Sequence, residues 1–311
     1  MTRFLADFNA VWPEGSPVGL AVSGGPDSLA LLALAHAALP GRFEVATIDH
    51  GLRTGSADEA AMVAALCAIR GITHATLAVD VERSGNLQAN ARYARYRALE
   101  RWAVERRLGA LVTAHHLDDQ AETLLMRLNR ASGARGLAGM RPRAMVPGGT
   151  RPLLRPLLGW RRAELAAIVA AEGHAPIDDP ANRNARFARA RIRRDLAKAA
   201  WLDPAAIAAS AAHLAETDAA LAWASAQIYA QAEIAGGTID WRVGETPRAL
   251  ALRVLERIVA DLGNGSPRGS DLARWHDMLA CGNTATLAGV RGAGGGAVWR
   301  FTRARPHRSP H

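Results

Sequence analysis

The chain has 311 residues, of which 49% are hydrophobic and 22% are charged, and these proportions argue against a wholly disordered protein. Its 38 basic residues outnumber its 29 acidic residues and give a net charge of +9, which favours a polyanionic partner, nucleic acid before membrane. The two cysteines are far apart and form no metal or disulfide pattern, and the N-terminus has no signal-peptide or membrane-spanning run, so we expect a cytoplasmic protein.

The first half of the chain alternates predicted strands with predicted helices. Periodicity predicts four strands, separated by segments of helix length. The strands are expected at 17–22, 43–49, 72–79 and 110–114, and the helices at 28–39, 56–70, 87–107 and 118–129. Strands that alternate with helices form parallel sheets, so the sequence predicts an α/β fold.

The second half reads mainly as helix. Residues 140–156 are rich in proline and glycine and break the pattern. Helices are expected at 160–172, 185–198, 204–234, 246–261 and 269–280, and a terminal hairpin at 284–290 and 297–302. We place a domain boundary near Trp201, with a ligand-binding domain at 1–200 and a smaller, mainly helical domain at 201–311.

The strongest motif is SGGPDS, residues 23–28, between the first predicted strand and its helix. Glycines let the backbone approach a ligand closely, and the start of the helix offers unpaired N–H groups to an anion. Asp27 would repel a phosphate unless a cation such as Mg²⁺ lay between them. The motif therefore predicts a phosphate site with a metal ion. A plain glycine turn with Asp27 or Ser28 as helix cap is the alternative.

Two common nucleotide motifs do not fit this loop. Lys198 is the only lysine, so the phosphate-binding lysine of a P-loop kinase or GTPase has no counterpart here. The loop also lacks the G-x-G-x-x-G pattern of hydride-transfer enzymes.

A second motif, HHLDDQAET, spans residues 115–123 after the fourth predicted strand. Asp119 and Glu122 are three residues apart and therefore share one helix face. Ligands bind at the carboxyl ends of parallel strands, so this pair is expected beside the phosphate loop, where it could hold a metal ion or a cationic substrate. The alternative is that Asp118 caps the helix and that the other acids are present because the helix dipole favours negative charge in the first turn.

Arginines form the remaining signals. Arg92, Arg95 and Arg97 begin one basic helix, and Arg186, Arg189 and Arg193 fall on one face of another. Arginine binds phosphates bidentately and stacks on bases, so the second helix favours nucleic-acid contact, with a solvated charged face as the alternative.

The SGGxDS pattern resembles the PP-loop, or N-type ATP pyrophosphatase, family. That resemblance implies a Rossmann-like doubly wound parallel sheet and an enzyme that splits ATP into AMP and pyrophosphate while adenylating an acceptor oxygen. The residues that would bind ATP are Ser23, Gly24, Gly25, Pro26, Asp27 and Ser28, with Asp27 on Mg²⁺.

Five further segments, in order, resemble the tRNA(Ile)-lysidine synthetase family. They are DHGLR at 49–53, NLQANARYARY at 86–96, HHLDDQAETLLMRLNRASGARGLAGM at 115–140, RPLLRP at 151–156 and DDPANRNARFARARIRRDL at 178–196. The resemblance implies a ligase that adenylates the oxygen on C2 of the wobble cytidine in the CAU anticodon of an isoleucine tRNA. Free L-lysine then attacks that carbon, and lysidine forms as AMP leaves.

The resemblance implies a role for each candidate residue. Asp119 and Glu122 would hold or deprotonate the lysine amine, and Arg95 and Arg191 would neutralise the adenylate or clamp RNA. Arg186, Arg189 and Arg193 would bind tRNA, which the C-terminal domain is also expected to contact. The departures from the family pattern are Ala131 in place of glycine, Gln88 and Asn90.

Two alternatives stay open at this point. One is another PP-loop enzyme with a different acceptor, although the sequence lacks the cysteine pairs of a thiolation enzyme. The other is a non-catalytic nucleotide- or RNA-binding module, although phosphate binding alone does not require Asp27, Asp119 and Glu122 together. The sequence does not give the oligomeric state, and a homodimer is one of the states that it allows.

Overall fold

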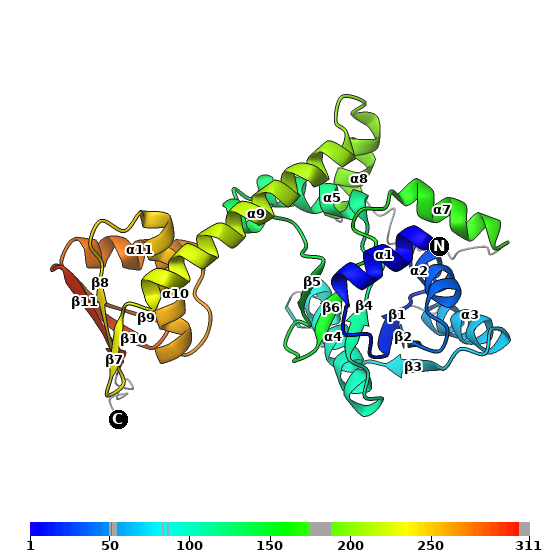
Figure 1. The fold of residues 1–311 in the computed structure, drawn as a ribbon, viewed down its shortest axis with the longest axis horizontal. Helices are drawn as coiled ribbons and strands as arrows, with labels where there is room; N and C mark the ends of the chain where they lie inside the picture. Colours follow the sequence, from blue (N-terminus) through cyan, green and yellow to red (C-terminus); the bar gives the residue numbers. More distant parts are fainter. Residues whose placement is uncertain (50, 52–54, 83, 86, 174–187, 305–311) are drawn as a thin grey trace. The chain divides into compact units, whose positions relative to one another are not determined.

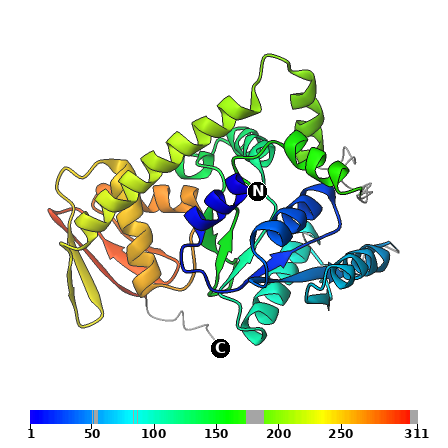
Figure 2. The same ribbon diagram turned by 45° about the vertical axis from the view of Figure 1, so that its right-hand side comes forward.

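The computed structural model describes residues 1–49, 51, 55–82, 84–85, 87–173 and 188–304. The chain divides into two compact units, Met1–Ala215 and Glu216–His311. Figure 1 shows the fold and Figure 2 the same ribbon turned by 45°. The expected domain boundary near Trp201 stays a prediction, and each unit is described by itself.

The first unit is built on a six-stranded sheet in the order β3-β2-β1-β4-β6-β5. All neighbouring strands are parallel except β5 and β6. The strand bounds are β1 Val18–Ala21, β2 Phe43–Asp49, β3 His74–Ala78, β4 Ala110–Val112, β5 Arg143–Met145 and β6 Pro152–Leu154. The strand order reverses between β1 and β4, as in a doubly wound sheet, and this confirms the predicted fold class.

One face of the sheet is covered by four helices: α1 (Thr2–Val11), α2 (Pro26–Ala38), α3 (Ser56–Ile69) and α7 (Arg162–Ala171). Helix α2 is apolar on nearly every side because it packs against the sheet, α1 and α7. The alternation of strand side chains sends Val18 and Leu20 of β1 into this core.

The opposite face is covered by α4 (Leu87–Glu105). Tyr96, Leu99 and Trp102 of α4 pack against residues of β2, β4 and β6. Gly19 of β1 faces Trp102, and a Cβ atom at Gly19 would lie 2.4 Å from the Trp102 ring. The missing side chain therefore lets α4 approach the sheet closely.

The first unit also contains the helices α5 (Leu117–Leu128), α6 (Ala134–Leu137) and α8 (Ala188–Lys198). The expectation that 140–156 is irregular is wrong in part, because β5 and β6 lie in this segment. Each of these strands has only three residues and lies in a segment rich in proline and glycine, which hides the strand pattern. Strand β6 extends the sheet beyond β4 and leads the chain to α7.

Helix α9 (Pro204–Tyr229) contains the boundary between the units. The second unit contains α10 (Arg248–Leu262), α11 (Gly269–Ala280) and a five-stranded antiparallel sheet in the order β7-β8-β11-β10-β9. The strand bounds are β7 Glu233–Ala235, β8 Thr238–Arg242, β9 Thr284–Leu287, β10 Val290–Ala293 and β11 Val298–Arg303. The second unit thus holds more strand than the expected hairpin, and the helix predicted to reach residue 234 ends at Tyr229.

The core of the second unit is aromatic. The Trp241 and Trp299 rings meet edge to face with centroids 5.6 Å apart, and Trp275 meets Phe301 in the same way at 5.6 Å. Apolar residues of α10 and α11 close this core over the sheet. The unit therefore has a hydrophobic core of its own.

Both cysteines are free thiols: Cys67 is buried against α2 and the sheet, and Cys281 is exposed at the end of α11. Among the described residues, no helix combines the length and the apolar character needed to cross a membrane.

Candidate active site

The SGGPDS loop connects β1 to α2. Gly24 has a φ of +81°, a conformation that side chains rarely adopt, and Pro26 occupies the first turn of α2. The Ser28 hydroxyl donates to the Gly25 carbonyl at 2.9 Å and accepts from the Ser23 amide at 3.1 Å. These bonds fold the loop over the start of α2, where unpaired N–H groups and the helix dipole attract an anion.

His116 caps the start of α5 and joins the second motif to the first. The Asp119 amide donates to His116 Nδ1 at 3.4 Å, and the His116 amide donates to Asp119 Oδ2 at 3.1 Å. The other ring nitrogen, Nε2, is 3.4 Å from Asp27 Oδ2, 3.5 Å from Asp119 Oδ2 and 3.4 Å from Arg162 Nη2. The His116 ring is fully buried and thus links the phosphate loop to the acidic helix.

Asp27 keeps its negative charge in this setting. Burial alone would raise its pKa, but His116 and the Arg162 and Arg193 guanidiniums outweigh burial and hold the pKa below its ordinary value. Among the described residues, its second oxygen, Oδ1, is buried without a hydrogen-bond partner. A buried carboxylate oxygen of this kind is available to a ligand.

Glu122 is bound by three guanidiniums. Arg189 Nε lies 2.8 Å from Oε2, Arg193 Nε lies 2.7 Å from Oε1, and Arg162 Nη2 lies 3.4 Å from Oε1. Arg189 Nη2 also bonds Asp119 Oδ1 at 3.0 Å. Burial would raise the pKa of Glu122, but Arg193 and Arg189 reverse this and lower it. Glu122 is therefore ionised, and the acidic pair is engaged by arginines of α7 and α8.

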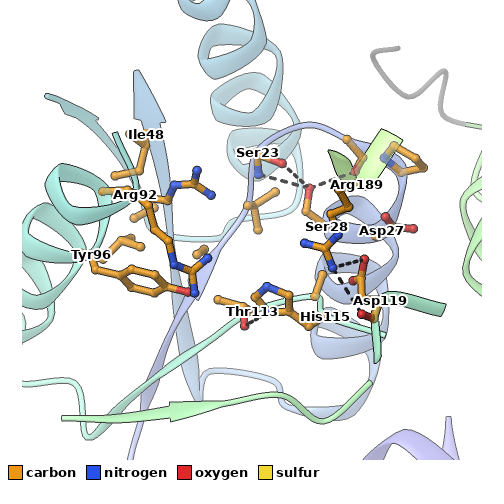
Figure 3. Close-up of a pocket in the computed structure, with 18 of the residues that line it drawn as sticks. Ser23, Asp27, Ser28, Ile48, Arg92, Tyr96, Thr113, His115, Asp119 and Arg189 are labelled. Carbon is orange, nitrogen blue, oxygen red and sulfur yellow. Dashed lines mark hydrogen bonds and ion pairs between the residues drawn. The ribbon is translucent and has the colours of Figure 1, made fainter. Parts of the chain in front are cut away.

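Both motifs open into one pocket of about 720 Å³, a size suited to a nucleotide-scale ligand. One wall is apolar and includes Ala46, Ile48 and Leu99. The residues drawn in Figure 3 show the polar side, where Arg189 reaches between the Ser28 hydroxyl and the Asp119 carboxylate. The pocket thus places a phosphate loop, an acidic residue and arginines around a single space.

His115 lies in the same pocket and is neutral. Its Nδ1 is 2.8 Å from the Thr113 hydroxyl. Burial lowers the pKa of His115 to about 3, and the positive charges of Arg155, Arg189 and Arg92 act in the same direction against the opposing charge of Asp119. The imidazole is therefore a neutral hydrogen-bonding group at neutral pH.

The predicted residues divide into three groups. Ser23, Gly25, Pro26, Asp27, Ser28, Arg95, Asp119, Arg189 and Arg193 line the pocket, while Gly24 shapes the loop and Glu122 bonds three of the lining arginines. Arg191 is exposed on α8 and is not among the lining residues. Arg186 and most of the 49–53 and 178–196 segments lie outside the described residues, as does the side chain of Gln88.

Sequence reasoning left three contributors unassigned: His116, Arg162 and Tyr96. Arg162 begins α7 and donates from its backbone to Asp118 Oδ2 at 2.8 Å, and Arg92 stacks on the buried Tyr96 ring at 4.9 Å. Arg162 follows β6 at the same sheet edge as the two motifs, and this position could have identified it. The signal could not be used because β6 was not predicted. Asn90 has a local role, because its Nδ2 bonds the carbonyls of Glu82 and Ser84.

The residues fit Mg²⁺ bound chiefly by a substrate. No cluster of three ligand-type side chains able to hold a metal occurs among the described residues. Mg²⁺ usually takes one or two carboxylates together with phosphates and water, and Asp27 Oδ1 offers one such oxygen beside the phosphate loop.

Comparisons with known proteins give consistent results. A family model described as a PP-loop domain matches residues 2–200. The tRNA(Ile)-lysidine synthase of Novosphingobium aromaticivorans is 54% identical over 310 residues, covering 99% of this chain and 95% of that protein. The tRNA(Ile)-lysidine synthase of Zymomonas mobilis subsp. mobilis is 41% identical over 304 residues, covering 95% of this chain and 91% of that protein.

The fold is shared with solved structures. One of them is the U34-tRNA thiolase NcsA from Methanococcus maripaludis with its 4Fe–4S cluster, with a TM-score of 0.56 at 16% identity over 70% of this chain and 78% of that chain. At this identity the likeness extends to the fold alone.

Proposed function

The chain belongs to the tRNA(Ile)-lysidine synthase family of PP-loop enzymes, and from this membership we propose that its pocket joins free lysine to a cytidine of tRNA. It is an ATP-dependent ligase that modifies tRNA. The observation that carries the site assignment is the meeting of Asp27 and Asp119 in one cavity, where a single buried histidine contacts both.

The ATP half of the reaction is assigned to the phosphate loop. We propose that the triphosphate lies on the start of α2, that the Ser23 and Ser28 hydroxyls donate to it, and that the adenine packs on the apolar wall. Asp27 would hold Mg²⁺, which supplies charge neutralisation for the phosphates. The cytidine O2 then attacks the α-phosphorus, and pyrophosphate leaves with the electron pair of the broken bond.

The lysine half is assigned to the acidic pair. The ε-amine, once deprotonated, attacks C2 of the adenylated cytidine, and AMP leaves with the former O2 atom. Asp119 and Glu122 would hold the ammonium before that step, because carboxylates favour a cation at hydrogen-bond distance. Arg95 would neutralise charge at the adenylate from α4, whose residues line the pocket.

The RNA contacts stay proposals. Arg186, Arg189 and Arg193 are proposed to bind tRNA phosphates, and Arg191, exposed on α8, to clamp RNA or neutralise the adenylate. Arg189 and Arg193 would have to leave the acidic pair to do so. The salt dependence of tRNA binding to variants of these residues tests the assignment, because each lost phosphate contact reduces the slope by about 0.7–0.9.

The test of the function is incorporation of labelled lysine into an unmodified isoleucine tRNA transcript with a CAU anticodon. We expect label to depend on ATP and Mg²⁺ and to appear in this transcript but not in a methionine tRNA with the same anticodon. Pyrophosphate release without label would assign the chain another acceptor. ATP binding without pyrophosphate release would identify a binding module instead.

Two finer proposals concern the protein in the cell. We propose a cytoplasmic location, because tRNA and ATP are both available there, and fluorescence microscopy of a tagged chain tests it. A homodimer stays a prediction that light scattering of the purified protein checks; a monomeric mass at working concentrations would contradict it.

A further inference from the structure

The acidic pair proposed to hold the lysine ammonium is already occupied by cations of the same chain. Glu122 is 1% exposed, and both of its oxygens are bonded by Arg189 and Arg193 of α8. Asp119 is 9% exposed, and its Oδ1 is bonded by Arg189. An incoming ammonium therefore has to displace at least one guanidinium from a buried carboxylate.

The same two arginines also border the phosphate side of the pocket. Both line the cavity together with Ser23 and Ser28, and Arg193 is close enough to Asp27 to contribute to the low pKa of that carboxyl. Their side chains are 39% and 31% exposed, so they retain access to the cavity. A guanidinium that leaves the acidic pair would thus meet the phosphates of ATP, which arginine binds bidentately.

Charge balance makes the two events depend on each other. Without substrates, Asp119 and Glu122 are paired with Arg189 and Arg193, and Arg162 Nη2 is a third partner of Glu122 at 3.4 Å. An ammonium alone displaces an arginine with no phosphate to receive it, and the phosphates alone draw both arginines of α8 away, which leaves buried Asp119 without a guanidinium and Glu122 with Arg162 only. Each of these states is costly, because a buried charge without a partner is unfavourable. Both ligands together restore the balance.

We infer that Arg189 and Arg193 exchange partners, moving from the acidic pair to the ATP phosphates as the lysine ammonium takes their place, and that this role replaces the tRNA contact proposed for these two arginines. This inference rests on the proposed function, since it takes lysine as the cation. It makes lysine and ATP bind with positive cooperativity before any tRNA is present. Coupling of this kind typically changes affinity by a factor of 5–150, so we expect at least about fivefold.

A purely structural ion-pair cluster would behave differently. Such clusters exist in protein interiors without any ligand role. If Arg189 and Arg193 only stabilise the packing of α8 on α5, the affinity for each substrate is independent of the other. The two accounts therefore differ in a quantity that binding measurements give directly.

The test measures binding of labelled lysine by equilibrium dialysis, with and without saturating α,β-methylene ATP and Mg²⁺. The methylene bridge prevents cleavage between the α and β phosphates. We expect lysine affinity to rise at least about fivefold with the analogue, and analogue affinity to rise by the same factor with lysine, as linkage requires. Equal lysine affinity in both conditions overturns the inference, and this comparison needs no variant.

Variants then assign the coupling. In the Arg189→Gln/Arg193→Gln double variant we expect lysine to bind without nucleotide and the coupling to fall below about twofold. The control is Arg194→Gln, which removes an exposed arginine on the same helix that pairs with Asp195 and should keep the wild-type coupling. Coupling that persists in the double variant overturns the inference; if that variant does not fold, the single Arg189→Gln variant carries the comparison.

The failure of the inference can be told apart from failure of the function. The same wild-type preparation is assayed for lysine incorporation into tRNA. Lysine incorporation without any lysine–nucleotide coupling leaves the function standing and removes the exchange. Absence of both lysine binding and incorporation removes the function, and the inference with it.

Discussion

The neutral imidazole of His115 links the site to acid stability. Its pKa in the folded protein is about 3, against an ordinary value of 6.5. Between these two pH values the unfolded chain binds a proton at this residue that the folded chain does not bind. The stabilising contribution is thus complete above pH 6.5 and is lost as the pH falls towards 3.

We predict that His115→Gln makes the protein less sensitive to mild acid. Between pH 6.5 and 4.5 the free energy of unfolding of the wild type should fall by roughly 1 kcal/mol per pH unit more steeply than that of the variant. Urea unfolding at several pH values gives both slopes. Parallel slopes would mean that His115 is protonated in the folded protein.

Single residues also show what the sequence could and could not reveal about the site. Asp27, Asp119 and Glu122 were identifiable because their motifs follow predicted strands at one sheet edge. Arg162 was not, because its role depends on β6, a strand that lies in a segment rich in proline and glycine and was not predicted. The departure at Ala131 is structurally visible, since its φ of +52° is a conformation that glycine adopts more easily.

At the scale of elements, the contact between β1 and α4 controls the shape of the pocket. Gly19 leaves room for the buried Trp102 ring, and Leu111 lies on the other side of the same space. Helix α4 carries Arg92, Arg95 and Tyr96 into the pocket. A displacement of this helix should therefore change nucleotide binding as well as stability.

We predict that Gly19→Ala destabilises the protein by about 1–3 kcal/mol, the usual effect of overpacking a core, and weakens binding of α,β-methylene ATP. Chemical unfolding and isothermal titration measure the two effects. Gly133→Ala is the matched control, because Gly133 has a φ of −72° and no described atom within 4 Å of an added Cβ. Unchanged nucleotide affinity in Gly19→Ala would show that α4 absorbs the added methyl group without moving.

Element prediction succeeded for the strand–helix alternation of the first unit, down to the three-residue β4, and missed β5, β6, β7 and β8. Helices such as α4 and α10 and the strand β2 carry enough residues for their periodicity to be read. Strands β5, β6 and β7 have three residues each, and β8 has five, so tertiary pairing rather than local pattern defines them. The sheet of the second unit was accordingly predicted only as a hairpin.

At the scale of the whole molecule, the two units have separate hydrophobic cores: the first packs both faces of its sheet, and the second has a core of its own. The pocket belongs to the first unit, since its lining residues run from Ala21 to Arg193. The second unit has its own core around Trp241, Trp275 and Phe301. Separate cores of this kind can unfold separately, so we expect each unit to have its own free energy of unfolding, that of the first unit being the one that His115 and Gly19 affect.

We predict two transitions in differential scanning calorimetry. The ATP analogue should raise the transition temperature of the first unit only. At a hundred times its dissociation constant it stabilises the folded unit by about 2.7 kcal/mol. Phe301→Ala should lower the transition temperature of the second unit only, because it reduces the free energy of unfolding of that unit by about 3–5 kcal/mol. One transition that responds to both changes would show that the units unfold as a single cooperative body.

The two thiols offer a practical consequence. Burial raises the pKa of Cys67 to about 11, so at neutral pH this thiol is protonated as well as shielded from reagents. Cys281 is exposed at the end of α11. A maleimide dye should therefore attach at Cys281 in the unaltered sequence and place one fluorescent reporter in the second unit, whose signal on addition of tRNA tests whether that unit responds to the substrate.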